Sequence, residues 1–176
     1  SLLRESKNNL GAYDLLVKSQ AQFPDDPDLQ YEQAMLAEKL GKPAEMERLL
    51  QKVIAAKPDY HHAYNALGFS MADRNVRLPE AKRLIKKALD AAPDDPFIQD
   101  SMGWVEFRLG NKPEALKSLE AAYRSKPDVE IAAHLGEVLW SLGQHSRAMA
   151  IWREGQKLNS ANETLQDTFK RLRVKP

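Results

Sequence analysis

The chain has 176 residues, of which 43% are hydrophobic and 29% are charged, and its formal net charge is +1. This near balance argues against a protein that holds a nucleic-acid backbone, because neutralising several phosphates requires a surplus of Lys and Arg on one face. The absence of cysteine excludes disulfides, thiolate metal sites and cysteine nucleophiles. No apolar run reaches the roughly 20 residues that a membrane-spanning helix needs.

A regular spacing of Pro-Asp dipeptides divides the chain into repeats. They recur at intervals of 34, 35 and 34 residues and begin at Pro24, Pro58, Pro93 and Pro127. Leu-Gly pairs recur in phase with them, ending at Gly41, Gly110 and Gly143. Because apolar residues between these markers recur at helical spacing, each unit is predicted to be a helix, a turn and a second helix.

In chain order, residues 1–26 are a partial repeat, of which residues 10–26 match a second helix. Four full repeats follow, at residues 27–60, 61–95, 96–128 and 129–161. Asp26-Pro27 and Asp95-Pro96 each combine an N-cap with a proline at the first helical position. The turn within residues 72–81 has no glycine and one additional residue. We therefore expect it to be longer and more irregular than the other turns.

Residues 162–173 predict one more helix at the C-terminal end. Leu165, Phe169 and Leu172 form an apolar stripe, and basic residues occupy the opposite side. Such a half-polar helix is typical of the cap that closes the last interface of a solenoid. A basic helix lying on a membrane surface is the alternative interpretation.

The period and its packing residues resemble the tetratricopeptide repeat (TPR) family. The best-matching unit carries the resemblance through Gly103, Gly110, Ala115, Leu119, Ala122 and Pro127. The resemblance implies an all-α fold, a right-handed solenoid of antiparallel helix pairs that forms a single array over residues 1–176. It also implies a concave groove lined by the first helix of each repeat.

Trp104 is the key residue for predicting what the groove does. At about 100° per residue it lies roughly 150° from the stripe that faces the second helix, so we expect it to be exposed in the groove. The same register predicts a groove wall that includes Asp73. Its candidate binding residues are Tyr31, Met35, His62, Asn65, Phe69, Phe97, Asp100, Trp104, Phe107, Arg108, Glu130, Glu137 and Trp140. The alternative is that Phe69, Trp104 and Phe107 pack against the first helix of the next repeat.

This predicted wall is aromatic and acidic, which favours a partner protein with apolar anchors and some positive charge. It does not favour the acidic chaperone termini that some TPR domains bind. On this basis, Trp104→Ala and Trp140→Ala are each expected to weaken partner binding with little loss of stability.

The sequence offers little for catalysis or metal binding. His134 and Glu137 lie at i and i+3 of one predicted helix, a spacing that metal ligands can have, but no second such pair converges on them. No phosphate-binding, dinucleotide-binding or nucleophile-elbow motif is present. We therefore expect no enzyme activity and no cofactor, with a metal protein centred on His134 and Glu137 as a minor alternative.

Three short sequence segments give a more specific resemblance. They are Asn65 to Phe69, Asp100 to Val105 and Ala133 to Trp140. In this order, residues 60–172 resemble the C-terminal repeats of bacterial TPR lipoproteins of the cell envelope. The resemblance implies a scaffold or adaptor at the periplasmic face of the outer membrane, with a carboxyl-terminal processing protease or its substrates as partners. A cytoplasmic location stays open, and we expect the sequence to be a fragment of a longer chain.

Self-association is the alternative function. Leu2, Leu3 and Leu10 would form an exposed first interface of a truncated array, which could stack on a second copy. Such a module would act as a homo-oligomer.

Overall fold

The computed structural model describes the backbone of residues 2–176 and the side chains of residues 8–176. The described residues form ten α-helices. They are α1 (Leu2–Gln22), α2 (Pro27–Lys39), α3 (Pro43–Ala56), α4 (His61–Asp73), α5 (Leu78–Ala91), α6 (Pro96–Arg108), α7 (Lys112–Ser125), α8 (Val129–Ser141), α9 (His145–Asn159) and α10 (Glu163–Leu172). None of these helices is both long and apolar enough to span a bilayer.

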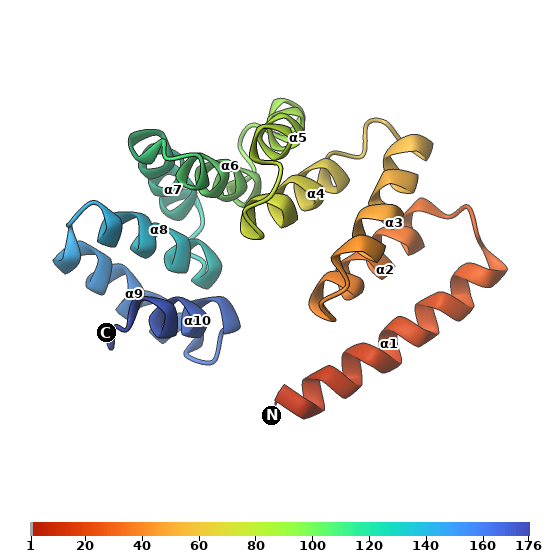
Figure 1. Ribbon diagram of the computed structural model, residues 1–176, viewed down its shortest axis with the longest axis horizontal. Helices are drawn as coiled ribbons and strands as arrows, with labels where there is room; N and C mark the ends of the chain where they lie inside the picture. The colour runs from red at the N-terminus through yellow and green to blue at the C-terminus, as the bar shows by residue number, and fades with distance from the viewer. Residues whose placement is uncertain (1) are drawn as a thin grey trace.

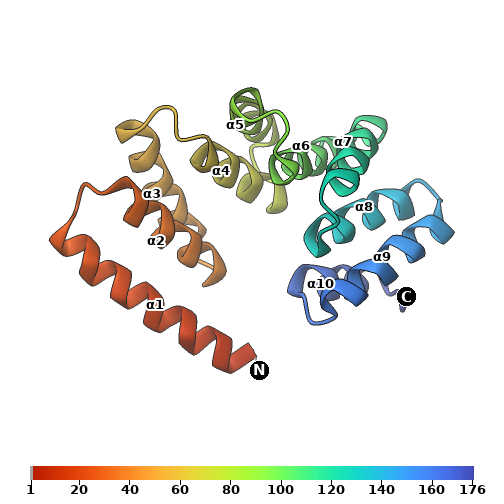
Figure 2. The ribbon, with the colours of Figure 1, turned by 180° about the vertical axis from the view of Figure 1, so that it is seen from behind.

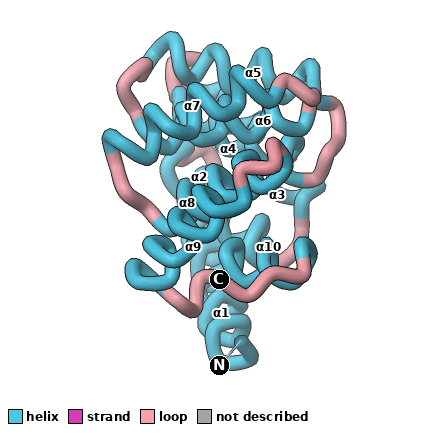
Figure 3. Tube along the Cα trace, turned by 90° about the vertical axis from the view of Figure 1, so that its left-hand side faces the viewer, coloured by secondary structure: helices cyan, strands magenta, loops and turns pink. Residues whose placement is uncertain are grey.

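The helices form a curved array with α1 at one end and α10 at the other (Figure 1). The same arc is seen from behind in Figure 2. Four antiparallel pairs, α2–α3, α4–α5, α6–α7 and α8–α9, supply the body of the array. Short loops join all the helices, and the N-terminal part of α1 extends below the rest of the molecule when it is seen from the side (Figure 3).

Local signals set the helix starts. The side chains of Asp26, Asp95 and Asp128 each accept hydrogen bonds from two backbone N–H groups in the first turn of the next helix, which satisfies donors that have no partner inside the helix. Pro27 and Pro96 follow two of these caps at positions where no N–H is needed. The helices therefore begin at the residues that the N-cap pattern indicates.

The turn between α4 and α5 is longer than its counterparts, as predicted. It has four residues, whereas α2–α3, α6–α7 and α8–α9 are each joined by three. Asn75, with φ of 58°, takes the left-handed conformation that glycine takes in the other turns. Arg74 and Arg77 in this turn both donate to Glu47, at 2.6 and 2.5 Å, so the irregular backbone is tied to the preceding repeat.

Helix α10 confirms the predicted C-terminal helix. Leu165 and Phe169 are buried, and the Phe169 ring contacts the Trp152 ring edge-on with centroids 5.6 Å apart. Since α10 packs on both α8 and α9, its apolar stripe is occupied within the chain. Helix α10 covers the end of the last repeat. It takes the position that the first helix of a further repeat would have, and no second helix pairs with it among the described residues.

Close approach inside each pair depends on small residues. Position 136 in α8 is glycine, and a β-carbon there would lie closer to the indole nitrogen of Trp152 in α9 than two non-bonded atoms can approach. Trp152 is completely buried. The glycine therefore lets the two helices come together over a large aromatic side chain.

Gly136→Ala is expected to lower the free energy of unfolding by about 2 kcal/mol, because Trp152 must move out of a well-packed site. Urea unfolding followed by circular dichroism measures this. The matched control is Gly11→Ala in α1, where nothing lies within 4 Å of the new carbon, and there the helix should be stabilised by about 0.5–1 kcal/mol. Equal stability of Gly136→Ala and the unmodified chain would contradict the packing described.

Candidate partner-binding site

The inner wall of the array is built by first helices that contact one another directly. Helix α4 contacts α6, α6 contacts α8, and α8 contacts α10. Direct contact between the same elements of successive repeats requires a short repeat-to-repeat distance, which occurs on the inside of the curve (Figure 1). Side chains on this face therefore meet the neighbouring repeat as well as solvent.

A series of polar links joins these helices. Each link runs from a carboxylate on one first helix to a donor on the next, and its two residues lie 31 to 34 positions apart. The links are Glu38 with Ser70 (3.1 Å), Asp73 with Trp104 (3.2 Å), Asp100 with His134 (2.8 Å) and Glu137 with Arg171 (2.7 Å). Because each member of the series spans one repeat, the series helps to fix how consecutive repeats are oriented.

The Asp100–His134 link is buried, with 6% of Asp100 and 3% of His134 exposed. Burial alone would lower the pKa of His134, but the charge of Asp100 and the hydrogen bond to it outweigh burial. Glu130 and Asp73 act in the same direction. The pKa of His134 is therefore raised above its ordinary value, so the imidazolium form is favoured in the folded chain.

Trp104 occupies the space between three first helices. Its indole N–H donates to Asp73 of α4, its ring stacks on His134 of α8 with centroids 4.3 Å apart, and the Arg108 guanidinium lies 4.9 Å from its centroid. Only 2% of Trp104 is exposed. The expectation that Trp104 is exposed is therefore wrong, and packing against the next first helix is confirmed.

The reason lies in the curvature. A helical wheel gives the direction in which Trp104 leaves α6, which is toward the inner wall, but it takes no account of the neighbouring repeats. On the inner side α4 places Asp73 against the indole N–H, and α8 places His134 in a stack on the ring. Trp104 therefore reaches the wall, but only a small part of its surface stays accessible.

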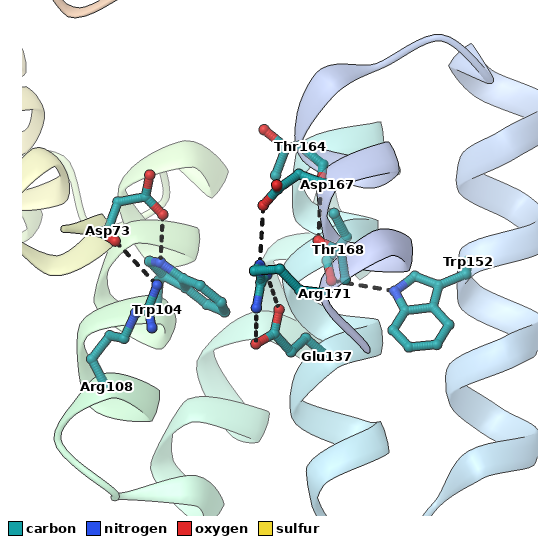
Figure 4. A network of polar contacts seen from close by, with 10 residues as sticks. Asp73, Trp104, Arg108, Glu137, Trp152, Thr164, Asp167, Thr168 and Arg171 are labelled. Atoms are coloured by element: carbon teal, nitrogen blue, oxygen red, sulfur yellow. Dashed lines mark hydrogen bonds and ion pairs between the residues drawn. The ribbon is translucent and has the colours of Figure 1, made fainter. Parts of the chain in front are cut away.

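A hollow of about 370 Å³ opens beside Trp104, between the body of the array and α10. Asp73, Trp104 and His134 form one side, and the other side comes from α10 through Glu163, Thr164, Asp167, Thr168 and Arg171. Figure 4 shows the two sides facing each other, with Asp73 and Trp104 opposite Thr164, Asp167 and Arg171. The hollow thus combines residues from four first helices.

Some charged groups of the hollow form ion pairs and others do not. Arg171 is bound to Glu137 at 2.7 Å and to Asp167 at 3.0 Å, and the hydrogen bond to Glu137 is the main reason why the pKa of Arg171 is raised. Within the part of the chain whose side chains are described, neither Asp73 nor Glu163 takes part in a salt bridge. The rim therefore carries an excess of negative charge.

The residues predicted for the groove lie in different environments. Asp100 and Glu137 are buried in the polar links, and Glu130 accepts a hydrogen bond from Asn162 at 3.0 Å. His62 is exposed, and so is Phe97, at 47%. The remaining candidate binding residues are half-buried; they are Tyr31, Met35, Asn65, Phe69, Phe107, Arg108 and Trp140.

Three of the half-buried aromatic residues pack within the chain. The Tyr31 ring lies 5.3 Å from the Tyr60 ring, Phe69 lies 5.7 Å from His134, and Phe107 lies 5.3 Å from Trp104. Of the thirteen predicted residues, the structure brings Trp104 into the lining of the hollow. The idea of a continuous exposed aromatic wall is therefore wrong.

Trp140 needs a separate correction. Its ring stacks on His145 of α9, with centroids 3.8 Å apart, and lies 5.7 Å from Trp152 of the same helix. Trp140 thus contacts the second helix of its own repeat, whereas Trp104 contacts the first helices of other repeats. The two tryptophans do not belong to one surface, because they sit at positions three residues out of register in their repeats.

The sequence prediction missed most of the hollow. Asp73 lay on the predicted wall but was not among the candidate binding residues, and of the α10 residues only Arg171 was assigned a place, on the wet side of a cap. A usable signal was present, because Glu163, Thr164, Asp167, Thr168 and Arg171 recur at the i, i+1, i+4, i+5, i+8 spacing of one helical face. Which helices that face meets could not be known without the curvature.

His134 and Glu137 do not form a shared metal site. His134 Nδ1 is bound to Asp100, and Glu137 is bound to Arg171. Among the residues whose side chains are described, no three His, Cys, Asp or Glu side chains are arranged to hold a metal ion.

Comparison with known sequences places the repeats in context. A TPR repeat-containing protein of Pseudomonas aeruginosa is 47% identical over 126 residues, which are 72% of this chain and 21% of that protein. YpiA of Bacillus subtilis, also a TPR repeat-containing protein, is 25% identical over 140 residues, which are 79% of this chain and 33% of YpiA. The chain therefore spans a third or less of the length of these relatives.

Solved structures share the fold. TTC0263, a thermophilic TPR protein of Thermus thermophilus, has a TM-score of 0.81 at 22% identity, over 98% of this chain and 95% of that one. YrrB, a TPR protein with an unusual peptide-binding site, has a TM-score of 0.61 at 18% identity, over 90% and 84% of the two chains. These likenesses confirm the all-α TPR solenoid.

The sequence profile of the tetratricopeptide repeat matches residues 31–96 and 101–162, which is more than half of the chain. The profile, the helix pairs and the solved relatives agree. This chain belongs to the tetratricopeptide repeat family.

Proposed function

We propose that this chain is a non-enzymatic scaffold that binds a peptide segment or a helix of a partner protein on its inner wall. The TPR fold supports a role in protein–protein interaction. The observation that carries the finer proposal is the hollow between α10 and the first helices, which offers polar groups beside an aromatic edge. A few polar groups that converge in a concave site are typical of specific binding sites.

The wider setting is proposed from resemblance. Residues 60–172 resemble TPR lipoproteins of the bacterial envelope. On this resemblance alone, we propose a scaffold at the periplasmic face of the outer membrane, in a proteolysis or assembly complex. A carboxyl-terminal processing protease or one of its substrates would then be the partner.

A displayed library of random peptides tests binding directly. Peptides selected on the unmodified chain are expected to bind Thr164→Trp at least about tenfold more weakly, because an indole at this half-buried rim position would fill the hollow. Fluorescence anisotropy of labelled peptides gives the dissociation constants. Ser146→Trp, at an exposed position of α9, is the control and should bind like the unmodified chain. If no peptide is enriched, or if Thr164→Trp binds every peptide normally, the proposal fails.

Self-association is the second candidate, because α1 exposes large apolar side chains. Leu10, Leu15 and Val17 are 46%, 66% and 42% exposed. The side chains of Leu2 and Leu3, also predicted for this interface, lie outside the described residues. A mass that rises with concentration in sedimentation experiments, and falls to that of the monomer in Leu15→Lys, would favour this function.

A further inference from the structure

We propose that the hollow receives the cationic side chain of a lysine or arginine of the bound partner. This inference rests on the proposed function and adds the chemistry of the partner to it. It also gives α10 a second role, since this helix would form one side of the binding site as well as the end of the array.

The charge around the hollow supports a cation. The carboxylates of Asp73, Glu163 and Asp167 line it, and all three residues are exposed. Arg171 and the imidazolium of His134 compensate part of this charge, but Arg171 is already held by Asp167 and Glu137, and His134 is held by the buried Asp100. Carboxylates at the mouth of a partly enclosed site act on an incoming charge more strongly than they would on a flat surface.

Acceptor capacity is also available. Asp73 Oδ1 accepts the Trp104 N–H at 3.2 Å, and a carboxylate has further lone pairs on both oxygens. Glu163 accepts no side-chain hydrogen bond from the described residues of its surroundings. Asp73 belongs to α4 and Glu163 to α10, so an ammonium or guanidinium group in the hollow would meet a carboxylate from each of its two sides.

The shape suits a long side chain with a charged end. A hollow of about 370 Å³ is larger than one water molecule or a bare ion needs. Trp104 and His134 contribute an aromatic edge along one side, against which the methylene stem of Lys or Arg can lie while its charged end stays near the carboxylates.

An acidic partner does not fit. A carboxylate would face Asp73, Glu163 and Asp167, and the two cationic groups of the lining are already bound, Arg171 by Glu137 and Asp167 and His134 by Asp100. Like charges brought together in an interface select against the wrong partner. The charge of the hollow therefore selects for the cationic class.

The test uses the peptides selected on the unmodified chain. Asp73→Asn/Glu163→Gln is expected to bind them about tenfold more weakly at low salt, and less so at high salt, because two carboxylates are lost. Asn at position 73 keeps an oxygen that can accept the Trp104 N–H, so the wall should remain intact. Glu114→Gln is the matched control, since Glu114 and Glu163 are both exposed acidic residues in the first turn of a helix.

The peptides are varied as well. Replacing one Lys or Arg of a selected peptide with norleucine should weaken binding to the unmodified chain about tenfold and leave binding to the double variant nearly unchanged. The Trp104 indole N–H signal in a proton–nitrogen NMR spectrum reports whether the cation reaches the hollow. It should shift with the Lys or Arg peptide and not with the norleucine peptide.

The possible failures are distinguishable. If peptides bind the inner wall, as judged by Thr164→Trp, but neither norleucine nor the double variant changes affinity, the cation proposal is overturned and the proposed function stands. If no peptide binds, both proposals fall. Selection of acidic peptides that bind the double variant more tightly would also overturn the cation proposal.

Discussion

Replacing Trp104 with Ala is expected to lower the free energy of unfolding by about 3–5 kcal/mol, the range for emptying a buried aromatic site. Trp104 is 2% exposed, stacks on His134 and donates to Asp73. Its loss removes packing between three first helices and leaves the Asp73 link without a donor. Urea unfolding followed by far-ultraviolet circular dichroism gives the change.

Two further variants separate the contributions of Trp104. Trp104→Phe keeps an aromatic ring but loses the N–H, so it should cost about 1–2 kcal/mol for the hydrogen bond and the smaller ring. Phe97→Ala changes an aromatic residue on the same helix that is 47% exposed, and should cost less than about 1 kcal/mol. Trp104→Ala with the stability of the unmodified chain would restore the interpretation of Trp104 as an exposed binding residue.

The fold was predictable because its signals act within one repeat. Asp95 and Pro96 specify the start of α6 through a cap and a residue that needs no N–H donor. Gly103 allows α6 to approach Leu119 of α7. The missing glycine in residues 72–81 even indicated a longer turn, and Asn75 supplies the left-handed conformation there. All these effects involve neighbours within one helix pair.

The site was only partly predictable because it depends on contacts between repeats. The helical wheel correctly directed Trp104 toward the inner wall, but its burial depends on contacts with Asp73 of α4 and His134 of α8, which the wheel leaves out. Arg171 was assigned to the wet side of a cap, although it binds Glu137 one repeat earlier. These contacts link residues 31 to 34 positions apart, and the curvature of the array decides which of them form.

Replacing Asp100 with Asn is the second change expected to have a large effect, and it should cost about 3 kcal/mol at pH 6. Asp100 and His134 are buried together, and removing one partner of a buried ion pair typically costs about 3–5 kcal/mol. The cost is expected at the lower end of this range because the Asn side chain can still form a hydrogen bond with His134. Asp90→Asn breaks an exposed i,i+4 pair with Lys86, and as the control it should cost less than about 0.5 kcal/mol.

The same pair makes stability depend on pH in a defined direction. The pKa of His134 is raised in the folded chain, because Asp100, assisted by Glu130 and Asp73, outweighs the opposing effect of burial. The stabilisation is therefore complete below about 6.5, the ordinary pKa of an unfolded histidine, and is lost as the pH rises through the raised pKa of the folded state. Urea unfolding at a series of pH values should show this decrease, with the cost of Asp100→Asn shrinking toward high pH.

His134→Gln distinguishes this pair from the other titrating groups. Gln can donate to Asp100 but does not titrate, so the variant should be less stable than the unmodified chain at pH 6 and should approach it at high pH. Because His134 also covers one face of Trp104, weakening the pair should loosen the side of the hollow that Trp104 forms. Partner binding should then weaken over the same pH interval in which stability falls. A stability difference between His134→Gln and the unmodified chain that stays constant with pH would show that Asp100 does not hold an imidazolium.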